Sequence, residues 1–104
     1  MRSWKERIIE AHVAVTDSVS HSERLESDRY FVWQEDGRND LKANNASGEK
    51  AVTGVTDFFT KKEFDPWAEA LGESFSSRGI AWSLVTVEYE PETGFYHYSW
   101  DWEV

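Results

Sequence analysis

The chain has 104 residues, no cysteine and a formal net charge of −9. This length predicts a single domain over residues 1–104. Disulfides and thiolate metal sites are excluded, and a reducing compartment suits the chain. The first ten residues carry charges throughout, unlike a secretory signal, and no stretch approaches the roughly 18 apolar residues that span a bilayer. We therefore expect a cytoplasmic protein that does not contact membranes.

The charge is unevenly distributed. Residues 79–104 contain five acids and neither lysine nor arginine. A field of this sign repels nucleic acid and membrane surfaces and speeds encounter with a basic partner. Acidic surfaces also keep small proteins soluble. The charge thus favours a basic protein partner over direct nucleic-acid binding, with solvation as the alternative explanation.

Helical spacing begins at the amino end. Trp4, Ile8 and Ala11 share one face, and Ser3 with Glu6 forms a capping box, which predicts a helix over 3–11. Residues 12–19 favour helix and strand about equally. The polar stretch 18–28 is typical of a loop or a frayed helix end.

The middle of the chain carries strand signals. The aromatic run 30–33 precedes Asp36-Gly37, a hairpin signal that predicts strands near 29–35 and 38–43. Residues 44–48 form a break. The β-rich composition of 51–60 predicts another strand, although Gly54 weakens the case.

A second helix is predicted over 66–78. Asp65 is placed to cap it, and Pro66 suits its first position. Gly79 is a natural terminator after Arg78. Its apolar face combines Trp67, Ala70, Leu71, Ser74 and Phe75.

The last quarter reads as a hairpin, Ile80–Tyr89 and Phe95–Val104, around the loop Pro91–Gly94. With Glu90 facing Phe95, one face pairs Tyr89–Tyr96, Val87–Tyr98, Val85–Trp100 and Ser83–Trp102. The other face pairs Glu88–His97, Thr86–Ser99, Leu84–Asp101 and Trp82–Glu103. The first face is the natural core side, and the second carries the acids. The resulting fold class is α+β, a small antiparallel sheet with two helices packed on one face.

Catalytic and metal-binding patterns are weak. The three histidines have no metal-ligand spacing, and there is no nucleophile elbow or phosphate cradle. His97 opposite Glu88 is the most suggestive pair, although such pairs on a solvated face are more often structural. Glu88 and Glu90 share a strand face without a recognised cleft between them. We therefore expect no enzyme and no cofactor.

An acidic surface with tryptophan anchors is the composition of a protein-binding hot spot. The candidate partner-binding residues are Trp82, Glu88, Glu90, Asp101 and Glu103. The alternative is that this second face is covered, either by residues 1–20 or by a second copy in a homodimer.

The carboxyl-terminal third resembles the YezG-like family of bacterial immunity proteins. The matching residues are Phe75, Trp82, Ser83, Thr86, Gly94, Tyr96, Asp101, Trp102 and Glu103, and Tyr30, Phe31 and Trp33 correspond to an earlier aromatic strand. The resemblance implies an α+β domain that neutralises a co-produced toxin, often a nuclease, by binding it. The alternatives are an acidic nucleic-acid mimic that inhibits a DNA-acting enzyme, a small enzyme using His97 and Glu88, and a structural homodimer.

Overall fold

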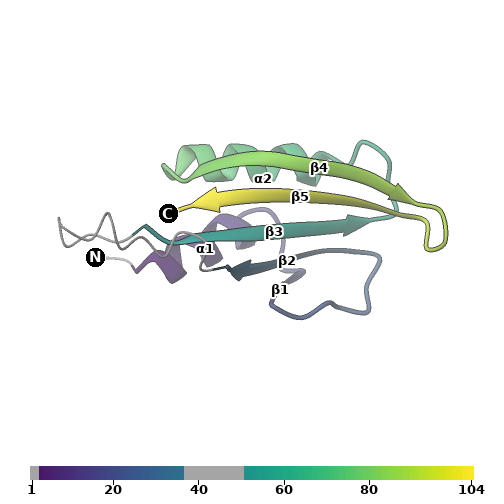
Figure 1. Cartoon of the computed structure of the whole chain (residues 1–104), viewed down its shortest axis with the longest axis horizontal. Helices are drawn as coiled ribbons and strands as arrows, with labels where there is room; N and C mark the ends of the chain where they lie inside the picture. The colour runs from purple at the N-terminus through teal and green to yellow at the C-terminus, as the bar shows by residue number, and fades with distance from the viewer. Residues whose placement is uncertain (1–2, 37–50) are drawn as a thin grey trace.

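The computed structural model describes residues 3–36 and 51–104, and it confirms the α+β class (Figure 1). The helices are α1 (Trp4–Val13) and α2 (Pro66–Ser77), and the strands are β1 (Val19–His21), β2 (Arg29–Glu35), β3 (Thr53–Thr60), β4 (Ala81–Glu90) and β5 (Phe95–Glu103). The strands form one sheet in the order β1-β2-β3-β5-β4. Both helices lie against the same face of this sheet, behind it in Figure 1. None of the helices in the described ranges is long and apolar enough to cross a membrane.

Local capping sets the ends of both helices, as predicted. Ser3 Oγ accepts a hydrogen bond from the Glu6 amide, and the Glu6 carboxylate accepts one from the Ser3 amide. At the start of α2, Asp65 accepts from the Trp67 amide. The chain leaves α2 through Gly79, whose φ of +72° is a conformation that glycine adopts without strain.

The antiparallel centre of the sheet is built from β2, β3 and β5. The strands predicted over 29–35 and 51–60 are confirmed as β2 and β3, which pair with each other. The second strand predicted near 38–43 lies outside the described residues. β3 pairs on its other side with β5, so the hairpin β4–β5 extends the sheet.

One strand falls where a loop or a helix end was expected. Val19–His21 pairs in parallel with β2 and makes the sheet mixed. The connection that follows returns over the opposite face of the sheet from the helices, where the Arg24 guanidinium lies 4.1 Å from the centre of the Phe59 ring. This strand forms because β2 offers it an edge, which no local pattern in residues 18–28 reveals.

The hairpin register is confirmed near the turn and wrong beyond it. Pairing runs as predicted from Glu90–Phe95 to Thr86–Ser99, and then a β-bulge at Val85 shifts β4 by one residue. The pairs Val85–Trp100, Ser83–Trp102, Leu84–Asp101 and Trp82–Glu103 are therefore replaced by Leu84–Trp100, Ser83–Asp101 and Trp82–Trp102. An extra residue in one strand reverses which face each later side chain points to. Trp82 and Leu84 consequently lie on the helix side of the sheet.

The main core lies between the helices and this face. Its fully or almost fully buried members are Ile8, Ala11, Phe31, Trp33, Phe58, Leu71, Phe75, Ile80, Trp100 and Trp102. Gly54 of β3 is needed there, because a Cβ would overlap the Trp102 ring and lie 2.5 Å from the carbonyl oxygen of Gln34. The opposite face carries only a small cluster of Tyr30, Val32 and Phe59, with Phe95 packed against it.

Candidate functional site

The outer strand β4 is the least covered element of the sheet. Its residues from Ala81 to Tyr89 are all exposed, and its only neighbour in the described sheet is β5. Five large apolar side chains on it are 39–54% exposed: Trp82, Leu84, Val85, Val87 and Tyr89. Hydrophobic residues scattered singly on a surface are normal, whereas five on one strand make β4 the candidate for an interaction surface.

A groove of about 650 Å³ runs between α2 and β4. Leu84, Tyr98 and Trp100 line it from the sheet, and Ala68 and Gly72 line it from α2. α2 runs along the helix side of β4 (Figure 1), and the groove is the space left between their facing side chains. Pockets with mostly apolar walls and a few polar groups are typical binding sites.

Trp82 closes one end of this groove by packing over α2. Its indole N–H donates to Ser76 Oγ at 2.9 Å. A Cβ at Gly72 would lie 2.9 Å from the Trp82 ring, so the glycine in the middle of α2 allows the ring to approach the helix closely. Trp82 keeps 39% of its surface exposed and can therefore also contact a partner.

A partly buried ion pair holds the other end of α2 against the sheet. Arg29 Nε and Nη2 donate to the two carboxylate oxygens of Asp65 at 2.8 and 2.6 Å, and the guanidinium lies 3.6 Å from the centre of the Trp67 ring. Burial alone would raise the pKa of Asp65. The hydrogen bonds from Arg29, the Trp67 amide and Thr60 outweigh that effect, and the pKa of Asp65 is lowered. Asp65 is therefore a structural anchor beside the groove.

The charged rim of the groove is acidic. Glu69 and Glu73 line it from exposed positions one helical turn apart, and neither Lys nor Arg is among its lining residues. Within the described ranges neither glutamate has an ion-pair partner. The field at the groove mouth is therefore negative and weakly compensated.

The structure divides the predicted partner-binding residues between two faces. Trp82 lies on the helix side, in the groove, and the predicted place for it beside the acids is wrong because of the bulge. The register puts the predicted acids Glu88, Glu90, Asp101 and Glu103 on the opposite face. Sequence reasoning did not single out Glu69 and Glu73 or Leu84, although the four-residue spacing of the two glutamates was a readable sign that they share a helix face.

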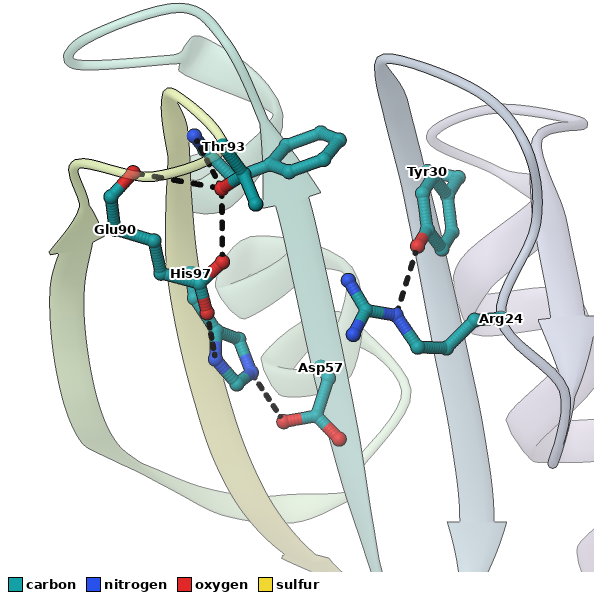
Figure 2. A network of polar contacts seen from close by, with 7 residues as sticks. Arg24, Tyr30, Asp57, Glu90, Thr93 and His97 are labelled. Atoms are coloured by element: carbon teal, nitrogen blue, oxygen red, sulfur yellow. Dashed lines mark hydrogen bonds and ion pairs between the residues drawn. The ribbon is translucent and has the colours of Figure 1, made fainter.

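Figure 2 shows a polar cluster on that opposite face, around His97. His97 Nε2 lies 2.8 Å from Asp57 Oδ1, and its Nδ1 lies 3.7 Å from Glu90 Oε2. Thr93 Oγ1 donates to Glu90 Oε1 at 3.1 Å. The backbone pairing of His97 with Glu88 is confirmed, but the histidine side chain contacts Asp57 and Glu90.

This cluster ties the hairpin turn to β3. The His97 ring stacks on Phe59 at 4.4 Å, and beside it Arg24 Nε donates to the Tyr30 hydroxyl at 3.3 Å. The contacts bridge β3, β4 and β5, so they hold the turn end of β4 in place while leaving its outer edge open. Among the described residues, no group of three or more His, Asp or Glu side chains could hold a metal ion.

Comparisons with known proteins found no related protein. No family model, no curated protein and no solved structure matches the chain. Its function must therefore be argued from its own residues, and those residues lead to β4 and the two surfaces beside it.

Proposed function

We propose that this chain is an immunity or antitoxin-like protein that binds and neutralises a basic protein partner, such as a nuclease toxin, through its hairpin β4–β5. The observation that supports this proposal is the exposed strand β4. It presents five apolar side chains at 39–54% exposure, within a segment, residues 79–104, that has five acids and neither lysine nor arginine. A strand with aromatic anchors on one side and acids on the other offers a basic protein both apolar contact and opposite charge.

The two kinds of side chain have different roles in this proposal. Trp82 and Tyr89 belong to the residue types that dominate binding hot spots, and burying them against a partner supplies affinity. Glu88 and Glu103 are exposed and have no ion-pair partner among the described residues. Such charges mainly raise the association rate and select a partner of opposite sign.

The identity of the partner rests on two further arguments. A nuclease must be basic where it grips nucleic acid, so an acidic surface suits it. The resemblance of the hairpin to YezG-like immunity proteins implies a toxin as the target. Neutralisation would take place in the cytoplasm, where a nuclease would otherwise reach the cell's own nucleic acid.

The test is co-expression with the candidate toxin, for which we choose the product of the gene immediately upstream, with growth and co-purification as readouts. Wild-type chain should protect the cells and co-purify with the toxin, more strongly at low salt than at high salt. The double variant Glu88→Lys/Glu103→Lys should lose both effects. The matched control Glu23→Lys/Glu26→Lys makes the same charge change in the exposed loop before β2 and should keep them.

Equal protection and equal co-purification by the two double variants would remove the hairpin from the interface. Co-purification of a DNA-acting enzyme in place of a toxin would favour the nucleic-acid mimic. Circular dichroism of each variant should match wild type, since the substituted residues are all exposed.

A further inference from the structure

The free edge of β4 raises the question of what kind of segment docks there. The sheet has two edge strands in its described part, β1 with three residues and β4 with ten. Very short edge strands offer few unpaired backbone groups, whereas long ones are templates for another strand. β4 contains neither proline nor lysine, the residues that usually blunt an edge, and its one interruption is the bulge at Val85. Its outward amide and carbonyl groups are therefore available for pairing.

The groove beside this edge can accept side chains of a strand whose backbone pairs with β4. Trp82, Leu84 and Trp100 line it on the same side of the sheet as α2. A strand added to β4 would point alternate side chains toward that side, because successive residues of a strand face opposite ways. Apolar side chains at these positions would enter the groove and cover the exposed parts of Trp82 and Leu84.

The charges decide between a second copy and a foreign partner. Two copies joined edge to edge through β4 would bring two helices α2 toward each other, each with Glu69 and Glu73 unpaired within the described ranges. Like charges at close range oppose association, and each chain already carries a net charge of −9. A basic segment would instead be attracted, since its cations would approach Glu69 and Glu73 on one face and Glu88 on the other.

We infer that β4 binds its partner by strand addition: an extended segment carrying lysine or arginine pairs with the edge of β4, and its apolar side chains enter the groove between α2 and β4. The inference rests on the proposed function and specifies how the basic partner docks. In this mode the backbone hydrogen bonds provide affinity, and the groove and its acidic rim provide selectivity.

The probe is an end-capped ten-residue peptide with the repeat Val-Lys-Lys-Thr, added to the full chain. One face of this strand alternates valine and lysine and the other alternates lysine and threonine, so lysines reach both the groove side and the Glu88 side of β4. Its affinity is measured by titration calorimetry at low salt, and its position is read from amide hydrogen exchange by NMR. Binding should slow the exchange of outward amides along β4 and leave β1 unchanged. The same peptide N-methylated at four central residues keeps every charge and side chain but loses backbone donors on both of its edges, and it should bind at least about tenfold more weakly.

Matched protein variants test the groove. Glu69→Lys/Glu73→Lys should weaken the peptide by about tenfold or more. The control Glu23→Lys/Glu26→Lys carries the same net charge and should stay within about twofold of wild type. All of these residues are exposed, and circular dichroism checks that each variant is folded.

Three results would overturn strand addition. They are equal affinity for the N-methylated peptide, new protection confined to β1 or to the Glu88 face away from the edge, and a dimer of the 12.1 kDa chain whose β4 amides are already protected without peptide. If β4 shows none of the expected protection while the co-expressed toxin is still neutralised, the proposed function stands and this docking mode falls. If the peptide adds to β4 and no toxin is neutralised, strand addition stands without the immunity role.

Discussion

The buried histidine of α1 predicts an acid-sensitive fold. His12 has no exposed surface, and its Nδ1–H donates to the Ile8 carbonyl at 2.8 Å. Trp102 Nε1 donates to Thr56 Oγ1 at 2.9 Å, and the Thr56 hydroxyl in turn donates to His12 Nε2 at 2.8 Å. The assignment follows because a carbonyl can only accept, so the neutral ring must carry its hydrogen on Nδ1. With His12 neutral, each donor in the series from Trp102 through Thr56 and His12 to the Ile8 carbonyl has an acceptor.

The size of the effect follows from the pKa. Burial lowers the pKa of His12 from 6.5 to about 4, and the hydrogen bond to Ile8 offsets this only in part. Between pH 6.5 and about pH 4, His12 is protonated in the unfolded chain but neutral in the folded chain. The free energy of unfolding therefore falls as the pH falls. Each pH unit costs about 1.4 kcal/mol, and the window down to about pH 4 costs about 3 kcal/mol. That is a large share of the stability of a small domain.

The assay is urea unfolding followed by tryptophan fluorescence at several pH values between about 4 and 8. His12→Gln keeps a polar side chain that does not titrate. It should lower the free energy of unfolding by about 2 kcal/mol at neutral pH. Its loss of stability between pH 6.5 and 4 should be smaller than that of wild type by about 3 kcal/mol.

The comparison isolates His12 from other titrating groups. The pKa of Asp65 is lowered from 3.8, so its stabilising contribution is present above 3.8 and is lost only at lower pH. Both proteins share that contribution. Parallel pH profiles for wild type and His12→Gln above pH 4 would refute the reasoning, because they would show that His12 titrates alike in the folded and unfolded chains.

The remaining predictions concern packing and the Arg29–Asp65 ion pair, and urea unfolding measures each of them. Gly54→Ala should lower the free energy of unfolding by about 3 kcal/mol, since the new methyl overlaps the buried Trp102 ring and a backbone carbonyl; an unchanged value would contradict the close approach. Gly72→Ala should change it by less than about 1 kcal/mol, because the gain in helix propensity offsets the displacement of the half-exposed Trp82, whose emission should shift to the red. Asp65→Ala should cost about 2–3 kcal/mol, as it removes the helix cap and the charged hydrogen bonds from the partly exposed Arg29, and a loss below about 1 kcal/mol would rule out that anchor.

Features that depend on neighbouring residues could be predicted from the sequence. The capping box at Ser3 and the Asp65-Pro66 start set both helices through hydrogen bonds that span only two or three residues. The four-residue loop set the first half of the hairpin register in the same way, because Glu90 and Phe95 must meet once the loop closes. The placement of Glu88 and Glu90 on one face follows from that register.

The candidate site was decided by tertiary structure. The bulge at Val85 moved Trp82 to the helix side, where the ring lies over Gly72 and bonds to Ser76. The groove itself depends on where α2 lies along the helix side of β4, because the facing side chains of the two elements form its walls. Those contacts join residues that no single local pattern connects.

The sequence by itself thus determined the helices, the near half of the hairpin, and the negative charge of the last quarter, because composition and short-range hydrogen bonding do not depend on how the elements pack. Only the tertiary structure decided that β1 joins β2, that His12 is buried against Thr56, and that β4 is an open edge beside an apolar groove. Each of these depends on side chains far apart along the chain fitting together, and that fit is a property of the packed molecule.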